Sequence, residues 1–315
     1  MIRIRRRTGR TTRSRRRLAS TTVTAGLRPF RTTGASGLHL VGDEIGPHDG
    51  PVVLLLHGGG QNRHAWKDTG RRLAAHGYRV IGVDARGHGD SDWCPHGHYD
   101  MAHFGDDVLA LLTHLDTVPA VVGASMGGLA TIDAQGRTPD RQLFRAVVLV
   151  DVTPEMEPDG VRRIMAFMQA HPDGFATLDE AADAIAGYNP DRPRSGTTAG
   201  LEKVLRRRPD GRWGWHWDPQ FLHGKVDVGD DDAMRERMAE RGRAWLDAAR
   251  RIDVPTLLVR GLLSDLVSDR TVASFRAAVP HADFVEVARA GHMVAGDRND
   301  AFADAVVAFL RDADR

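Results

Sequence analysis

The sequence contains a serine in a pattern that is typical of nucleophilic catalysis. Ser125 lies in Gly123-Ala124-Ser125-Met126-Gly127-Gly128, directly after an apolar run at 120–123 and before a predicted helix at 127–135. The pattern G-x-S-x-G between a strand and a helix indicates a nucleophile elbow, a strained turn that lifts the serine hydroxyl above a sheet. Glycines are required on both sides because side chains there would clash with neighbouring backbone. The sequence therefore predicts Ser125 as a nucleophile.

A serine hydroxyl is nearly inert at neutral pH, so Ser125 needs a general base. His292, in Gly291-His292, comes shortly after the last predicted strand at 283–287 and before the predicted terminal helix at 299–312. None of the other histidines follows that strand. We predict that His292 takes the proton from Ser125.

The base in turn needs a carboxylate that holds its tautomer and stabilises the imidazolium. Asp265 follows the predicted strand at 256–259, and sites in α/β sheets gather at such strand ends. Asp151 and Asp269 also lie near strand ends. We expect Asp265 to supply the carboxylate, with Asp151, after the strand at 146–150, as the main alternative.

A second glycine cluster can stabilise the oxyanion of acyl transfer. Leu56-His57-Gly58-Gly59-Gly60 closes the predicted strand at 51–56. A tetrahedral intermediate requires preorganised N–H donors, and glycines let the backbone approach closely. We predict the amides of Gly59 and Met126 as these donors. His57 and His88 are expected to brace loops, with direct catalysis as the alternative.

The predicted elements that carry these residues alternate between strand and helix. Continuous apolar runs are typical of strands buried on both faces of a mostly parallel sheet. The pattern changes between 152 and 251, where helical segments surround a stretch rich in proline and tryptophan and no buried strand is predicted. The alternation then resumes. The fold class expected is one α/β domain with a mostly helical insertion.

Together these residues resemble the α/β-hydrolase fold superfamily in type and order. The resemblance rests on His57–Gly60 with Trp66 downstream, the charged run Asp84–Asp92, Gly123–Gly128, Asp265 and Gly291-His292, and it covers residues 38–312. It implies a mostly parallel central sheet flanked by helices, with a helical cap between the sixth and seventh core strands. The implied division is a core of 37–151 and 252–315, a cap of 152–251, and a basic, disordered extension at 1–36.

The predicted cap holds aromatic and methionine side chains that could meet a substrate. Trp213, Trp215 and Trp217 alternate, which would place three indoles on one face of an extended segment. We predict substrate contacts from Gly58, Gly60, Trp215 and Trp217. Packing that anchors the cap is the alternative for the tryptophans, and cap packing is also the alternative to an acyl pocket for Met165 and Met168.

Composition excludes several classes of protein. The net charge of +1 is the sum of a head at 1–42, with eleven arginines and no acid, and a body of charge −10. That body argues against nucleic acid, and no apolar run is long enough to cross a membrane. The single cysteine, Cys94, excludes an internal disulfide. Asp84–Asp92 lacks metal-ligand spacing, so we expect neither a metal nor an organic cofactor, and a cytoplasmic location.

The function predicted is a serine hydrolase with a small acyl substrate, most similar to ester hydrolases and to cofactor-free haloperoxidases or perhydrolases. Epoxide hydrolases and haloalkane dehalogenases share the stretch at 86–92 but use an aspartate nucleophile, so Ser125 argues against both. A C–C bond hydrolase and a non-catalytic binding protein remain alternatives because a fold does not fix a function. The oligomeric state is left open.

Overall fold

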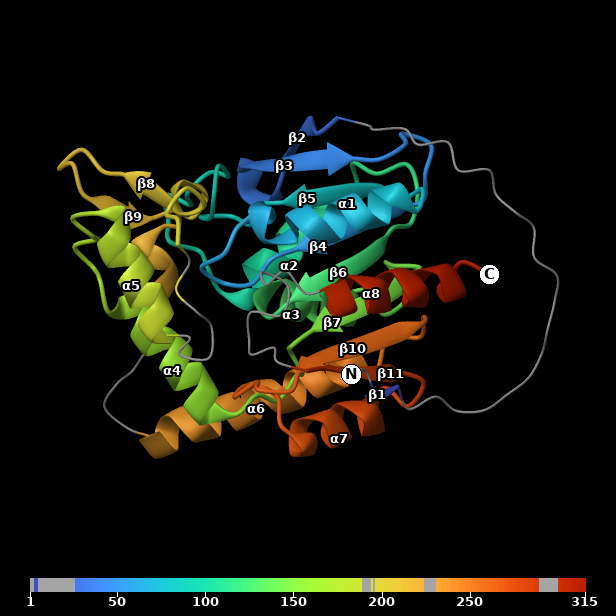
Figure 1. Ribbon diagram of the computed structural model, residues 1–315. Helices are drawn as coiled ribbons and strands as arrows, with labels where there is room; N and C mark the ends of the chain where they lie inside the picture. The colour runs from blue at the N-terminus through green and yellow to red at the C-terminus, as the bar shows by residue number, and fades with distance from the viewer. Residues whose placement is uncertain (1–2, 5–25, 189–193, 195, 224–230, 289–299) are drawn as a thin grey trace.

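The computed structural model describes residues 3–4, 26–188, 194, 196–223, 231–288 and 300–315, and a nine-stranded sheet runs through it (Figure 1). The strand order is β1-β11-β10-β7-β6-β4-β5-β3-β2. The strands are β1 (Arg3–Ile4), β2 (Arg28–Thr33), β3 (His39–Ile45), β4 (Val52–Leu56), β5 (Arg79–Val83), β6 (Ala120–Ala124), β7 (Ala146–Val150), β10 (Thr256–Gly261) and β11 (Asp283–Val287).

Six of these strands, from β5 through β4, β6, β7 and β10 to β11, pair in parallel. At the edges β1, β2 and β3 pair antiparallel to their neighbours. The carboxyl ends of the parallel strands therefore meet at one edge of the sheet. The mostly parallel sheet expected from the sequence is confirmed.

Helices cover both faces of the sheet (Figure 1). On one face α1 (Lys67–Ala75) packs with α8 (Asp300–Ala313). On the other face α3 (Met126–Gly136) contacts α2 (Met101–Leu112) and α6 (Asp231–Ala249), and α6 contacts α7 (Asp269–Ala278). No helix in the described part of the chain is long and apolar enough to cross a membrane.

Two buried cores, one on each face, explain the continuous apolar strands. Successive strand residues point to opposite faces, so Val53 and Leu55 pack in the core beside α1 and α8, whereas Val52 and Leu54 pack in the core beside α2 and α3. Every residue of β6 and β7 is buried. This burial fixes the strand register and holds the strand ends that carry the candidate site.

The cap elements gather at one end of the molecule, on the left of Figure 1. They are α4 (Pro158–Gln169), α5 (Leu178–Tyr188), the hairpin of β8 (Leu205–Arg207) and β9 (Trp213–Trp215), and the short 3₁₀ helix η4 (Pro219–Leu222). The chain enters this region after β7 and leaves it before β10. Not counting the two-residue β1, these are the sixth and seventh strands of the central sheet in chain order.

The cap limits predicted from the sequence include a helix that packs with the core. In α6, Leu246 and Ala249 belong to the core beneath α3, and a Cβ on Gly136 would lie 2.4 Å from the Cβ of Ala248. Tight packing against α3 therefore places α6 in the helical layer of the core. The composition of residues 231–249 alone does not distinguish a helix of the cap from a helix of the core.

The basic extension predicted at 1–36 is wrong for its last part. Residues 28–33 form β2, which pairs along its whole length with β3, and Arg28 donates to the Glu44 carboxylate at 2.5 Å. Arg3–Ile4 form the edge strand β1. An edge strand needs only one apolar face, and the alternating burial of β2 explains why its composition resembled a solvated tail. The other residues of 1–25 lie outside the described part of the chain.

Candidate active site

Ser125 occupies a strained turn between β6 and α3. Its backbone has φ 45° and ψ −113°, a conformation that residues other than glycine rarely adopt. The Ser125 amide donates to the Val150 carbonyl at 3.1 Å, so the neighbouring strand holds the turn in place. Such strain persists only where the surroundings impose it, and it is concentrated at functional sites. The structure thus provides the elbow that the G-x-S-x-G pattern indicates.

The glycines around Ser125 are required by close backbone contacts. A Cβ on Gly123 would lie 2.7 Å from the amide nitrogen of Gly128, and a Cβ on Gly127 would lie 2.4 Å from the Leu56 carbonyl oxygen. Both distances are shorter than the contacts that a Cβ atom makes with backbone atoms in folded proteins. The turn can form only because these positions lack side chains, as predicted.

The loop after β4 brings Gly58 beside the serine: a Cβ on Gly58 would lie 3.3 Å from the Ser125 Cβ. The three glycine amides of this loop differ in their hydrogen bonds. The Gly58 amide donates to Gln61 Oε1 at 3.1 Å, and the Gly60 amide donates to His88 Nε2 at 3.1 Å. Between them, the Gly59 amide has no acceptor among the described residues. Gly59 is thus the amide of this loop that remains available to an incoming oxygen.

His57 and His88 hold this loop in place through both ring nitrogens. His57 Nε2 accepts from the Ala85 amide at 2.9 Å, so its Nδ1 donates to the Gly58 carbonyl at 2.8 Å. His88 Nε2 accepts from Gly60, so its Nδ1 donates to the Arg86 carbonyl at 2.9 Å. Burial lowers the pKa of His57, which keeps the ring neutral, with Asp84 acting in the opposite direction. These contacts agree with bracing roles.

The charged run at 84–92 folds around one buried carboxylate. Asp84 accepts from the Arg63 amide at 2.6 Å and from the Asp90 amide at 2.9 Å, and it pairs with the Arg63 guanidinium. A Cβ on Gly89 would lie 2.1 Å from the Asp84 carboxylate. The run therefore shapes a loop around Asp84. Across the described residues, no group of three or more His, Cys, Asp or Glu side chains could hold a metal ion.

The three candidate acids differ sharply in their surroundings. Asp269 has a side chain that is 96% exposed and pairs with Arg260. The Asp265 side chain is 32% exposed, and its Oδ2 accepts from Arg163 of α4 at 3.0 Å. Asp151 is fully buried, with φ 48°. Of the three, Asp151 alone combines burial with a strained backbone conformation.

Asp151 lies at the strand end next to that of Ser125, because Ala124 of β6 pairs with Val150 of β7. Its carboxylate accepts from the Gly261 amide at 3.0 Å and from Ser264 Oγ at 2.7 Å. Asp151 therefore also shapes the loop after β10 that carries Asp265. His292 and Gly291 lie outside the described residues, so the predicted base has no described position relative to either acid.

Cap side chains lie over the glycine loop. The Phe221 ring comes within 3.2 Å of a Cβ position on Gly59, and the Met168 Cε within 2.9 Å of one on Gly60. Trp217 Nε1 is 3.8 Å from the same Gly60 position. Trp215 instead packs inside the cap, with ring centroids 5.7 Å from Phe167 and 5.3 Å from Phe175. Of the two tryptophans predicted to contact substrate, Trp217 is the one beside the loop.

Phe221 is a candidate site residue that the sequence does not indicate. It lies on η4, where Asp218 caps the helix by accepting from the Gln220 amide at 2.9 Å. Asp218 is tied to the core, since Tyr99 donates its hydroxyl to the Asp218 carboxylate at 2.5 Å and the Asp218 amide donates to Gly87. The Asp218-Pro219 pair predicts a helix start, but nothing in the sequence indicates what this helix covers.

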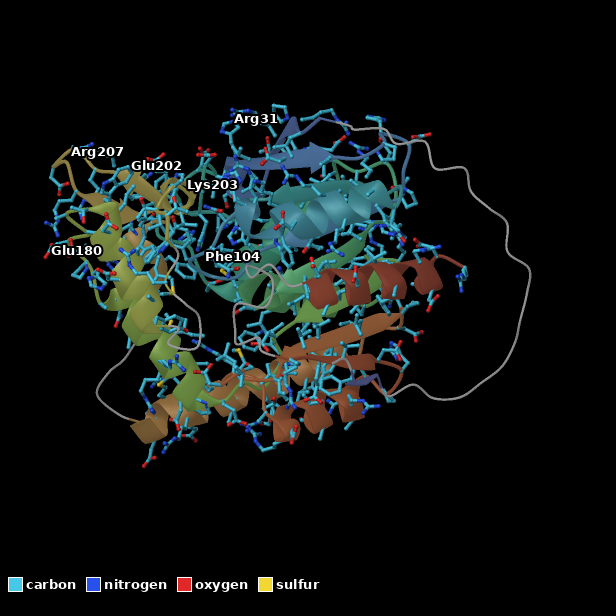
Figure 2. All side chains as sticks on the ribbon, viewed as in Figure 1. Arg31, Phe104, Glu180, Glu202, Lys203 and Arg207 are labelled. Atoms are coloured by element: carbon cyan, nitrogen blue, oxygen red, sulfur yellow. The ribbon has the colours of Figure 1, made fainter. Side chains whose placement is uncertain are left out.

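Further contacts join the cap and the core. Asn62 donates to the carbonyl of Lys203, which is labelled in Figure 2 near Glu202 and Arg207 of the cap. The Gly89 amide donates to the His216 carbonyl at 2.7 Å. At the other side of the cap, Arg163 joins Asp265. The cap is therefore attached to the core at loops that border the site.

Known proteins resemble this chain in sequence and in structure. Residues 53–305 match the pattern of the alpha/beta hydrolase family. Esterase Rv0045c of Mycobacterium tuberculosis is 30% identical over 267 residues, which cover 81% of each chain. The non-heme chloroperoxidase of Streptomyces lividans is 30% identical over 256 residues, covering 79% of this chain and 84% of the relative.

Solved structures of hydrolases also resemble this chain. The crystal structure of E-2-(acetamidomethylene)succinate hydrolase superimposes with a TM-score of 0.74 and 26% identity, covering 91% of this chain and 100% of the other. That of the Mycobacterium tuberculosis esterase has a TM-score of 0.67 and 27% identity, with 90% and 91% of the two chains covered. The chain belongs to the alpha/beta hydrolase family.

Proposed function

We propose that this protein is a serine hydrolase that cleaves a carboxylic ester or a related acyl compound through an acyl-enzyme intermediate. The observation that carries the proposal is the strained Ser125 at the N-terminus of α3, beside a glycine loop whose Gly59 amide is available. Amides at a helix N-terminus and in a rigid loop are suited to stabilise the negative charge that acyl transfer creates.

In the proposed mechanism, Ser125 Oγ attacks the substrate carbonyl carbon while His292 takes the hydroxyl proton. The carbonyl oxygen becomes an oxyanion that accepts from the amides of Gly59 and Met126. Collapse of this intermediate breaks the ester C–O bond, and His292 returns the proton to the leaving alcohol. Water, deprotonated by His292, then attacks the acyl-enzyme and releases the acid and free Ser125.

Two carboxylates, Asp265 and Asp151, compete for the role of acid partner of His292. The sequence predicts Asp265, whose carboxylate is partly exposed and paired with Arg163. Asp151 is fully buried at the strand end beside Ser125, where a carboxylate strongly favours a neighbouring imidazolium. We therefore propose Asp151 as the acid, with Asp265 as the competing assignment. Comparison of the two asparagine variants separates these assignments.

A perhydrolase or haloperoxidase-like reaction is the second candidate. A bifunctional esterase/perhydrolase of Acinetobacter calcoaceticus is 34% identical over 135 residues, covering 41% of this chain, and the chloroperoxidase relative covers more. Hydrogen peroxide would replace water at the acyl-enzyme and yield a peracid, and the same serine would form the intermediate. Bromination of monochlorodimedone that requires both acetate and peroxide would reveal this activity.

The test of the main proposal combines turnover with labelling. Hydrolysis of p-nitrophenyl esters is measured for the wild type and for Ser125→Ala, and a fluorophosphonate probe is applied to both. We expect the substitution to lower kcat by about 10⁴-fold or more and to abolish the adduct, because the triad acts as a unit. Wild-type turnover in Ser125→Ala, or no adduct on folded wild-type protein, would overturn the proposal.

A further inference from the structure

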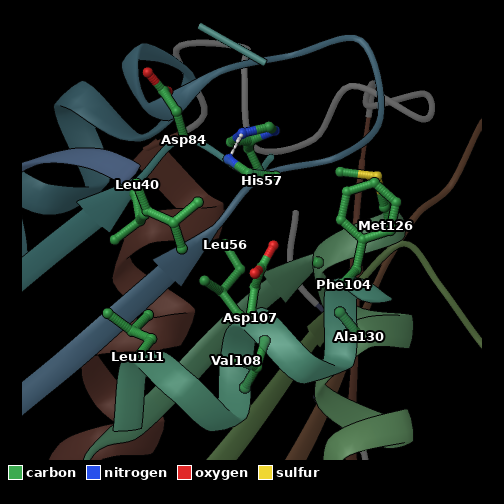
Figure 3. A pocket seen from close by; sticks show the side chains of 13 residues that line it. Leu40, Leu56, His57, Asp84, Phe104, Asp107, Val108, Leu111, Met126 and Ala130 are labelled. Carbon is green, nitrogen blue, oxygen red and sulfur yellow. Dashed lines mark hydrogen bonds between the residues drawn. The ribbon is translucent and has the colours of Figure 1, made fainter. Parts of the chain in front are cut away.

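A buried ion pair anchors the loop that follows β5. Arg86 is fully buried, and its guanidinium donates to the two carboxylate oxygens of Asp107 at 2.6 and 2.7 Å. Its third nitrogen donates to the His98 carbonyl at 3.1 Å. Asp107 lies on α2 and, together with His57, borders a small cavity at the ends of β4 and β5 (Figure 3). Two parallel hydrogen bonds of this kind fix both the position and the orientation of the arginine.

Both histidine braces of the glycine loop end on two consecutive residues of this anchored segment. His57 holds the backbone carbonyl on one side of Gly59, and His88 holds the backbone amide on the other side. The His57 ring accepts from the Ala85 amide at 2.9 Å, and the His88 ring donates to the Arg86 carbonyl at 2.9 Å. The orientation of both rings therefore depends on where residues 85 and 86 lie.

The ion pair is the hydrogen-bonded contact that joins these two residues to a helix of the core. Within the described part of the chain, the backbone groups of Ala85 and Arg86 bond to the rings of His57 and His88 and to the His88 amide. Those contacts stay between the two loops. The Arg86 side chain instead reaches Asp107 on α2, so α2 provides the fixed point for this segment.

We propose that Arg86 and Asp107 are positioning residues for the oxyanion site, because they hold the segment from which both braces reach the glycine loop. The inference rests on the proposed function, in which the Gly59 amide meets the oxyanion. Neither side chain of the pair touches the substrate. A shift of residues 85–86 would move both imidazole rings and change the direction of the Gly59 amide. Oxyanion donors act through preorganised direction, so such a shift should lower kcat and leave substrate binding nearly unchanged.

The alternative is that the ion pair only stabilises the fold. Asp107 also accepts from the Ala35 amide at 2.9 Å, which ties the turn before β3 to α2. Glu44 offers a matched comparison, because its side chain is 8% exposed, as is that of Asp107, and it pairs with Arg79 at 2.8 Å. Arg79 begins β5, whereas Ala85 follows the other end of that strand. Glu44→Gln therefore disrupts a buried ion pair far along the strand from the braces.

The test compares Asp107→Asn with Glu44→Gln in the hydrolysis of p-nitrophenyl esters. Each substitution removes the charge of a buried carboxylate that faces an arginine, so each should lower the melting temperature. We expect Asp107→Asn to lower kcat by about tenfold with KM within about twofold, a smaller loss than displacement of a catalytic group itself. Glu44→Gln should keep the wild-type kcat. Equal losses of kcat in the two variants, or a wild-type kcat in folded Asp107→Asn, would overturn the proposal.

A paired substitution keeps the proposal testable if Asp107→Asn does not fold. Arg86→Met together with Asp107→Leu replaces the ion pair by apolar side chains, an exchange that often preserves the stability of a protein. The double variant should remain folded and still lose kcat, since apolar packing does not fix the direction of the segment as the paired hydrogen bonds do. A wild-type kcat in the folded double variant would contradict the positioning role.

The NMR spectrum of protein labelled with ¹⁵N in its histidines supplies a readout that does not depend on turnover. In the wild type, His57 and His88 should each show a protonated Nδ1 and an accepting Nε2. These signals should shift or broaden in Asp107→Asn and stay in place in Glu44→Gln. Unaltered signals in Asp107→Asn would overturn the inference. Shifted signals together with no ester turnover and no fluorophosphonate adduct in the wild type would instead contradict the proposed function.

Discussion

The glycine loop and the cap that covers it are held by different forces. In the loop, backbone groups of Gly58 and Gly60 bond to Gln61, His57 and His88 over distances of 2.8–3.1 Å. The cap side chains Phe221, Met168 and Trp217 instead meet the loop through apolar contact. Hydrogen bonds fix direction, whereas apolar packing tolerates a change of shape. The loop is therefore suited to chemistry and the cap to selectivity.

This contrast ranks the expected effects of substitution. Changes that remove a group acting on the reacting atoms or on the base should lower kcat most. Changes in the residues that brace the loop should cost less, and changes in the cap should alter KM and substrate preference. The dependence of stability on pH that burial of His57 creates should be the smallest of these effects.

The largest of the remaining effects is expected at the acid. Asp151→Asn should lower kcat by about 10³–10⁴-fold, because an asparagine favours the wrong tautomer of the base. Asp265→Asn should lower kcat by less than about tenfold. Rates are measured from acid to alkaline pH, since loss of the acid should also lower the apparent pKa of the base. A larger loss of kcat in Asp265→Asn would instead support Asp265, the residue that the sequence predicts, as the acid.

The control for Asp151→Asn is Ser264→Ala, which removes one hydrogen bond to the same carboxylate. If Asp151 served only to shape the loop after β10, both variants would lose similar activity and similar thermal stability. We expect Ser264→Ala to retain most of its activity. Melting temperatures of all three variants show which of them remain folded.

The bracing of the loop is tested at His88. His88→Ala leaves the Gly60 amide without its acceptor, so the neighbouring Gly59 amide should lose its direction. We expect kcat to fall by up to about 100-fold with little change in KM, as for a small displacement of a catalytic group. His103→Ala on α2, which loses a contact with Asp100, is the matched control. An unchanged kcat in His88→Ala would contradict the proposal that bracing of the loop directs the Gly59 amide.

The cap is tested at Phe221. Phe221→Leu keeps an apolar contact with Gly59 but changes its shape, so we expect KM to change by less than about tenfold and kcat to stay within twofold. Phe284→Leu, on β11, is the matched substitution away from the glycine loop. Should Phe221→Leu reduce kcat as strongly as His88→Ala, the cap would share in directing the amides proposed to bind the oxyanion.

The smallest effect concerns stability and pH. Burial lowers the pKa of His57, so the folded protein keeps the ring neutral while the unfolded chain binds a proton near pH 6.5, about the ordinary histidine pKa. The contribution of His57 to the free energy of unfolding should therefore be complete above that pH and should decrease as the pH falls below it. Urea unfolding is measured in the Ser125→Ala background, which separates stability from turnover.

His57→Asn is the comparison for this dependence. It removes the titrating group, so its stability should be lower at neutral pH and should decline less steeply on acidification. His64, whose pKa burial also lowers, retains its share of the slope in both proteins. Equal slopes in the two proteins would mean that His57 does not titrate between the folded and unfolded states as proposed.

Short-range patterns in the sequence determined the sheet and the elbow. Apolar runs at β4, β6 and β7 are buried on both faces, and the glycines near Ser125 have backbone within carbon-contact distance. Such features are local because a strand needs apolar residues and a turn of this kind needs glycine. The same reasoning failed for β2, whose exposed and basic residues belong to a sheet edge.

Only the tertiary structure decided which distant residues meet. The pairing of Ala124 with Val150 places Asp151 beside the turn of Ser125, and packing of η4 places Phe221 over Gly59. It also assigned α6 to the core, through contacts that the composition of the helix does not reveal. The sequence by itself determined the chemistry available at each strand end. The order of strands in the sheet and the packing of the cap decided which groups share the site, because both depend on contacts between segments far apart in the chain.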